Sequence, residues 1–389
     1  MDISRLHHLA SQSAAVRSRA RLVPVGGKAD KVFPPTYEGG RYATELRRID
    51  GEQVECVLLD SVQSQANRFE AALQEALDRD QIAIPCIRVR FPDEVGRELG
   101  SVTSLTAPHR CYDAILRDSA ILDSGVLFPK SEIGAALSAA RPIDATALFR
   151  YCPTVLVFGG WDSTGVRGGM GAKFTRAVSS EIVGISILAG VRTFSRIDPL
   201  EIRREVEVVV DGDDRTSWRL AESGEKGAKR PSEILHGNIA PTIDEAGGGV
   251  TIEQAEQTWV LSLPALRRYR FPIAGDHDDA RDVAARSVLV ALALAARALA
   301  RADGLFLRSR CQLIPLAGEH GLEAVASDGS TEQLDDPTVE EATALLAAAV
   351  DAAAATGLEW QRDPVELEAQ PRLVELVSRS FALASKSAE

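Results

Sequence analysis

The segment from residue 154 to residue 184 has the residue types of a nucleic-acid binding loop. Glycines recur in it after an apolar run, 154–158: Gly159, Gly160, Gly165, Gly168, Gly169 and Gly171. Three cations and an indole stand among or just after them, against one acid: Trp161, Arg167, Lys173, Arg176 and Asp162. Glycine lets the backbone approach a ligand closely, and cations with a ring suit phosphates and flat bases. The pattern predicts an RNA or single-stranded DNA site, although its composition also fits a flexible surface loop.

Other chemistries fit this segment poorly. A phosphate loop of the Walker type ends in Gly-Lys-Ser/Thr, but residues 171–174 read GAKF. A serine nucleophile elbow needs G-x-S-x-G, and residues 160–165 read GWDSTG, one position out. Paired metal ligands of the type C-x-x-C or H-E-x-x-H do not occur in the sequence. We therefore expect no metal and no cofactor.

One acidic run keeps an enzymatic alternative open. Asp276, His277 and Asp278 stand side by side and have the side chains that hold a divalent ion. A nuclease or phosphotransferase with these ligands is the alternative function. The same run also suits an exposed turn that caps the following helix.

Basic residues recur in three further places, each with a simpler interpretation. His109, Arg110 and Arg117 could contact phosphates, or could form surface ion pairs with Asp113 and Asp118. A second cluster holds Arg267, Arg268 and Arg270, and suits either a phosphate track or a solvated strand edge. Arg308 lies on one face of an alternating strand, where solvent exposure is the simpler account.

The overall charge is acidic but uneven. The 389 residues carry a net charge of −12, which argues against a protein coated in nucleic acid. Residues 335–370 hold nine acids against one base, whereas residues 17–31 hold five bases against one acid. Local potential steers a phosphate backbone, so the total does not exclude a basic binding surface.

The composition is that of a soluble globular protein, 45% hydrophobic and 26% charged. The longest apolar run, 288–296, is too short to span a bilayer, and the N-terminal residues lack the apolar stretch of a secretion signal. We expect a cytoplasmic protein without membrane contact. Its five scattered cysteines predict reduced, mostly buried thiols.

Strands and helices alternate along the chain. Residues 54–59 predict a buried strand, followed by a helix that Asp60 caps with Gln63 as its partner. Further strands are expected at 82–91, 154–158, 206–210, 259–263 and 305–314, and helices at 174–188 and 279–302. Asp336 is expected to cap a final helix with Pro337 in its first turn. This alternation predicts an α/β or α+β sheet domain with insertions.

Five stretches match a known family in order and spacing. They are CVLLDSVQSQANR at 56–68, the segment from APHR at 107 to DAILRDS at 119, FGGWDS at 158–163, SEIVG at 180–184 and LRSRC at 307–311. Together they resemble the backbone RAMP protein of type I-G (formerly I-U) CRISPR systems, in the Cas-seven superfamily. The resemblance extends from about residue 32 to about residue 316.

The resemblance implies an α+β fold with an RRM-like (ferredoxin-like) palm and inserted finger and thumb lobes. On this basis residues 1–330 form one palm, with a finger-like helical insertion at 92–150 and a thumb-like excursion at 212–250. Residues 331–389 are then an acidic helical C-terminal extension, which matches no part of the family.

The resemblance also implies a non-catalytic subunit that binds CRISPR guide RNA. Several copies would line the guide with other subunits of a surveillance complex, and target DNA would be recognised through pairing with the guide in antiviral defence. The residues expected to contact RNA are Gln63, Gln65, Asn67, Arg68, His109, Arg110, Arg117, Trp161, Arg167, Lys173, Arg176, Arg267, Arg268, Arg270 and Arg308.

Overall fold

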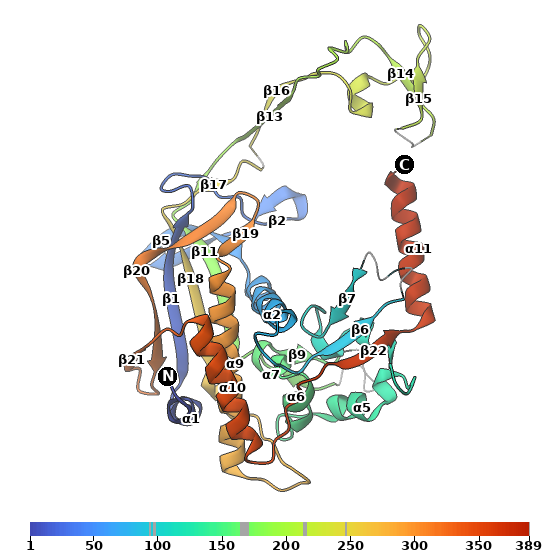
Figure 1. Ribbon diagram of the computed structural model, residues 1–389. Helices are drawn as coiled ribbons and strands as arrows, with labels where there is room; N and C mark the ends of the chain where they lie inside the picture. The colour runs from blue at the N-terminus through green and yellow to red at the C-terminus, as the bar shows by residue number, and fades with distance from the viewer. Residues whose placement is uncertain (93–94, 96–98, 164–170, 213–215, 246, 389) are drawn as a thin grey trace.

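The protein is built around a large antiparallel sheet. The computed structural model describes the chain except residues 93–94, 96–98, 164–170, 213–215, 246 and 389. Seven strands lie in the order β19-β20-β1-β18-β11-β5-β4, and β21 pairs with β20 (Figure 1). Their bounds are β1 Ala15–Pro24, β4 Thr44–Ile49, β5 Glu52–Asp60, β11 Val178–Ile185, β18 Gln254–Ser262, β19 Leu305–Arg308, β20 Cys311–Val325 and β21 Thr331–Leu334.

Helices cover one face of this sheet. They are α1 (Ile3–Gln12), α2 (Val62–Asp78), α9 (Asp279–Ala302) and α10 (Val339–Ala354), with α9 packed against the other three. Strand β1 shows why one face is apolar, because Val16, Ala20 and Leu22 are buried while Arg19 and Arg21 on the other face are exposed. The alternation of a strand sends successive side chains to opposite faces.

The central elements follow a simple order in the chain. With other elements inserted between them, strand β1, helix α2, strands β11 and β18, helix α9 and strand β20 come in this order. In the sheet these four strands stand in the order β20-β1-β18-β11. Helix α9 is long and apolar enough to cross a membrane, but 89% of its apolar window is buried inside the protein. It is therefore the central helix of the core.

A second, four-stranded sheet lies beside α2 (Figure 1). Its order is β7-β6-β22-β8, and β22 pairs in parallel with β6 and antiparallel with β8. The strands are β6 Ile87–Arg90, β7 Ser101–Thr103, β8 Ser119–Ile121 and β22 Val365–Ala369, and short helices surround them, α4 Ala114–Arg117, α5 Glu132–Ala139, α6 Thr146–Tyr151 and α7 Thr154–Phe158. The acidic segment thus contributes a strand to this sheet and a helix to the core, while the division into palm, finger and extension stays a prediction.

A long two-stranded ribbon extends from the end of the large sheet (Figure 1). It comprises β12 Leu188–Ala189, β13 Arg192–Arg196, β14 Val208–Val210, β15 Trp218–Leu220, β16 Ile239–Asp244 and β17 Val250–Thr251. Large apolar side chains on it are exposed, among them Phe194 (51%), Ile197 (87%) and Ile243 (71%). Helix α11 (Pro371–Ala388) extends from the small sheet after β22 (Figure 1), and Leu373 and Val374 in its first turn pack against the core.

Several sequence-based expectations are confirmed. The structure mixes helix and sheet, as an α+β chain does. Helix 279–302 has the expected bounds, and strands lie at 208–210 and 254–262 where strands were predicted. All five cysteines are buried and free.

Two expected elements have the opposite type. Residues 154–158 form helix α7 instead of a strand, and residues 178–185 form strand β11 instead of a helix. All five residues of α7 are buried, whereas β11 lies between β18 and β5 and buries residues 178, 180, 182 and 184 on one face. Neither segment has a clear hydrophobic period, which is the signal that separates helix from strand.

Two expected caps and one strand are also wrong. Ser61, not Asp60, caps α2, and Thr338, not Asp336, caps α10. In each case the acid pairs with arginines, and the hydroxyl of a nearby residue caps the helix instead. Residues 305–314 form two strands, β19 and β20, because Arg310 adopts a positive φ of 57° in the turn between them.

Candidate nucleic-acid interface

Helix α2 is fixed to the sheet by Asp60, the last residue of β5. Its side chain is fully buried and accepts hydrogen bonds from Gln65 Nε2 at 2.6 Å and from Arg68 Nε at 2.8 Å. Arg308 Nη2 lies 3.5 Å from the other carboxylate oxygen. A buried carboxylate is stable only when it is paired and hydrogen-bonded, so these partners tie the first two turns of α2 to the end of β5.

The same network extends to four strands. Gln65 Oε1 accepts from Ser180 Oγ at 2.9 Å and from Gln257 Nε2 at 2.8 Å. Arg68 Nη2 donates to the carbonyl of Leu307 at 2.6 Å, and Arg308 Nη1 to that of Leu59 at 2.8 Å. Gln65, Arg68 and Arg308, which the sequence predicted as RNA contacts, thus use their polar atoms inside the protein.

Two other predicted residues of α2 face solvent. Gln63 and Asn67 are exposed and lie one turn apart on the same side of the helix. Glu70, the next residue along this side, is 2% exposed and points into the protein. Along this side of α2, the exposed side-chain amides of Gln63 and Asn67 are therefore followed by Glu70, which belongs to a buried ion pair.

Glu70 and Arg110 form that buried pair. Arg110 donates from Nε and Nη2 to the two carboxylate oxygens of Glu70, both at 2.6 Å, and from Nη1 to the Gly159 carbonyl at 2.9 Å. Burial raises the pKa of Glu70 to about 7, against the charge and hydrogen bonds of Arg110, which lower it. The bidentate geometry ties α2 to the backbone at the start of the glycine loop.

A short hairpin, with two residues in each strand, follows Gly159. Strands β9 (Gly160–Trp161) and β10 (Lys173–Phe174) pair, with Lys173 opposite Trp161. The Lys173 ammonium lies 4.3 Å from the indole centroid, and Trp161 is 44% exposed. Nearby, Arg176 Nε donates to the Phe158 carbonyl at 3.3 Å, and burial together with the charge of Arg110 lowers the pKa of Arg176. Arg167 lies outside the described residues.

These groups make one surface, which we call the α2–hairpin strip. It consists of Gln63, Asn67, Trp161, Lys173 and Arg176, all of them exposed. The Glu70–Arg110 pair joins its two halves. In the part of the chain that the structure describes, no carboxylate lies within 4 Å of the Lys173 or Arg176 cations. Amide groups, two unpaired cations and an exposed indole are the groups that hold a single-stranded polynucleotide.

The remaining predicted contacts lie elsewhere. Arg267 belongs to helix α8 (Leu263–Arg267) and donates to the carbonyls of Ala10 and Ser13, at 3.2 and 2.8 Å. Arg270 pairs with Asp282 at 2.7 Å, while Arg268 is exposed. This cluster is therefore neither a strand edge nor a continuous track.

The predicted contacts near position 110 also divide into exposed side chains and side chains that pair within the protein. His109 is exposed, and Arg117 forms a half-buried pair with Asp118 at 2.8 Å, as the simpler interpretation expected. Asp113 instead caps α4, accepting from the Ile115 amide at 2.9 Å.

The acidic run of the alternative function serves the start of α9. Asp278 caps that helix by accepting from the Ala280 amide at 2.8 Å, and the Asp276 carbonyl accepts from Arg281 Nη1 at 2.9 Å. Across the described residues, no group of three or more His, Cys, Asp or Glu side chains is placed to hold a metal ion.

Of the two buried acids that organise the site, sequence reasoning gave Asp60 the role of a helix cap and missed Glu70. Glu70 falls within the apolar stripe of α2, between Ala66 and Leu73, and both neighbours are buried. An acid at such a position predicts a buried cationic partner. That signal was available in the sequence, whereas the identity of the partner, Arg110, was not.

Comparisons with known proteins agree with part of the sequence analysis. The family model of CRISPR-associated protein GSU0053 matches residues 16–189, the part that holds nearly all of β1, the whole of α2 and the whole strip. No curated protein matches the chain. Among solved structures, Csc2 of Thermofilum pendens is 12% identical, covers 98% of this chain and 79% of its own, and has a TM-score of 0.27. A chain of a Type IV-B CRISPR complex is 12% identical, covers 83% and 96%, and has a TM-score of 0.24. TM-scores this low do not establish a shared fold.

Proposed function

We propose that this protein is a guide-RNA-binding backbone subunit of a type I-G CRISPR surveillance complex. The α2–hairpin strip carries the proposal, because it places unpaired cations, amides and an exposed ring on one surface within the segment that a CRISPR-associated family model matches. Lys173 and Arg176 bind phosphates, and Trp161 stacks on a base. None of these groups reads a base sequence, which suits a guide of variable sequence.

The order of the central elements supports an RRM-like palm. When the inserted elements are left out, β1, α2, β11, β18, α9 and β20 follow the strand-helix-strand-strand-helix-strand order of the ferredoxin-like fold. In this assignment the ribbon from β12 to β17 is the thumb-like lobe, so this lobe begins before residue 212. Its exposed apolar side chains suit contact with another molecule.

The subunit acts without catalysis in this proposal. Copies of the chain line one guide RNA in the cytoplasm, together with other subunits, and target DNA is recognised by pairing with the guide. The protein holds the guide through its phosphates, while the buried Asp60 network and the Glu70–Arg110 pair hold the binding surface in shape.

The proposal is tested by the mass of the particle with and without guide RNA. Purified without added metal, the protein should carry RNA, absorb strongly at 260 nm and form larger particles on RNA than alone. If the purified protein does not bind RNA oligomers even at low salt, the proposal is contradicted. Cleavage of nucleic acid that requires a divalent ion would favour the nuclease alternative.

A further inference from the structure

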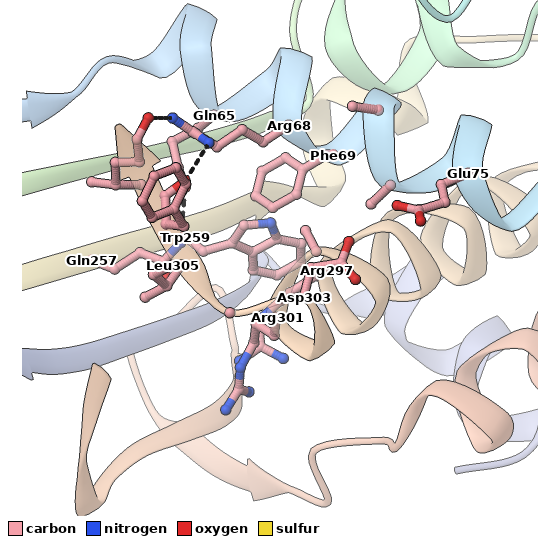
Figure 2. A pocket seen from close by; sticks show the side chains of 16 residues that line it. Gln65, Arg68, Phe69, Glu75, Gln257, Trp259, Arg297, Arg301, Asp303 and Leu305 are labelled. Atoms are coloured by element: carbon pink, nitrogen blue, oxygen red, sulfur yellow. Dashed lines mark hydrogen bonds between the residues drawn. The ribbon is translucent and has the colours of Figure 1, made fainter. Parts of the chain in front are cut away.

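A pocket lies between helices α2 and α9, on the covered face of the sheet. We call it the α2–α9 pocket, and its volume is about 360 Å³. In Figure 2, Trp259 of β18 lies between Arg68 and Phe69 of α2 on one side and Arg297 and Arg301 of α9 on the other. All sixteen lining residues belong to the described part of the chain.

Trp259 has an unused hydrogen-bond donor at this pocket. The side chain is 1% exposed, and its indole Nε1 has no partner. Buried donors are almost always paired, so this N–H is available to an acceptor on a ligand that displaces the groups now covering it. Arg297 lies over the indole ring at 5.6 Å from its centroid.

Other lining groups suit a flat ligand. Arg68 donates in its own plane to Asp60, Phe306 and Leu307, so its planar faces remain for stacking. The Phe69 ring lies next to it (Figure 2). Gln257 also lines the pocket, and its Nε2 donates to Gln65 Oε1, another residue of the lining. Aromatic rings, guanidinium planes and amides are the groups that bind unstacked nucleobases.

The charges around the pocket are balanced, so the pocket has no excess positive charge that would favour an anionic ligand. Arg68 is paired with Asp60, and Arg297 and Arg301 share Asp336. Two further acids, Glu75 and Asp303, stand in the lining. A neutral ring therefore fits better than a phosphate or a carboxylate.

The pocket is continuous with the α2–hairpin strip. Ala71 lies one turn after Asn67 on the exposed side of α2 and also lines the pocket. Its side chain is only a methyl group, so it leaves the pocket open toward Asn67. A strand lying along Gln63 and Asn67 therefore passes its mouth. We propose that the α2–α9 pocket receives one unstacked nucleobase of the RNA held on the strip. This inference rests on the proposed function.

Photocrosslinking tests the inference and does not require that the RNA binds the protein in one fixed register. RNA containing 4-thiouridine is bound to the protein, irradiated, and the crosslinked peptides are identified by mass spectrometry. We expect crosslinks at Phe69 or Trp259 in addition to Trp161. Ala300→Phe, which adds a ring at the pocket wall, should abolish the first set and leave the crosslinks at Trp161 intact. Ala354→Phe, at an exposed position of α10, is the matched control.

A second variant removes only the donor. Trp259→Phe keeps a ring but loses the N–H, and should lower the crosslink yield at Phe69 several-fold while circular dichroism shows an unchanged fold. Crosslinks at Trp161 without any at Phe69 or Trp259 would refute the pocket inference and leave the proposed function standing. Pocket crosslinks that persist in Ala300→Phe would also refute it. A third result would refute it as well: no pocket crosslinks in the wild type, together with altered self-association of the Ala300→Phe variant. In that case the pocket is occupied by a side chain of another protein copy. Absence of all crosslinks and of RNA binding would remove both proposals.

Discussion

Removing the two free cations of the strip should weaken RNA binding by a calculable amount. Lys173→Gln and Arg176→Gln together delete two positive charges that no described carboxylate neutralises. Each phosphate contact to a single strand contributes about 0.7 to the slope of log affinity against log salt. The double variant should therefore lower that slope by about 1.4, and at about 0.1 M salt it should bind about 25-fold more weakly.

The measurement is fluorescence anisotropy with a labelled RNA oligomer, repeated across a salt series. The effect should be the same for RNAs of different sequence, because phosphate contacts do not read bases. A charge-matched control is Arg362→Gln with Arg379→Gln, two exposed arginines that pair with Asp351 and Glu375. Surface pairs of this kind contribute little to stability, so the control should fold and bind normally.

The reasoning fails on one clear outcome. If the double variant keeps both the affinity and the salt slope of the wild type, Lys173 and Arg176 do not touch phosphates. If the control loses as much as the double variant, only the total charge of the protein matters and the strip is not the binding surface.

Three further predictions concern the residues that support the site. Glu70→Ala leaves Arg110 buried without its carboxylate and should cost about 3 to 5 kcal/mol of unfolding free energy in urea titrations; an unchanged midpoint would show that the pair is unimportant. For Asp336, burial alone would raise the pKa, but Arg297 and Arg301 outweigh it and hold the pKa below the usual 3.8. Its contribution to stability is therefore present above that value and lost as the pH falls through the lowered pKa, so Asp336→Asn should flatten the acid limb of the stability profile; an identical profile would contradict this. Asp278→Ser keeps a capping oxygen on α9 and removes the carboxylate, so RNA binding and assembly should be unchanged; loss of a metal-dependent cleavage activity in this variant would instead support the nuclease alternative.

The sequence predicted elements well where the hydrophobic period was strong. The stripe of α2 and the long apolar run of α9 both gave helices at the expected places. Residues 154–158 were misassigned because a segment that is buried on all sides shows no period. Residues 178–185 were misassigned because their apolar side chains do not alternate along the sequence, although one face of the strand is buried. Local propensity cannot settle such segments, since their type depends on which neighbours they pack against.

The candidate site was predictable only in part. Lys173, Arg176 and Trp161 are exposed, as a binding role requires, and their grouping followed from short sequence spacing. Arg68, Arg110 and Arg308 carry the same charge but use it on partners inside the protein. Those partners lie up to 249 positions away, and a single sequence contains no signal for such distant pairs.

The place of β22 in the small sheet has a consequence for biosynthesis. It lies between β6 and β8, yet it is made long after them, because β8 ends at Ile121 and β22 begins at Val365. At the usual rate of translation this delay is about 10 to 50 seconds. Throughout that interval both older strands have an open edge, a known starting point for misassembly. Until β22 emerges, the nascent chain of this protein therefore carries two strand edges that lack their final partner.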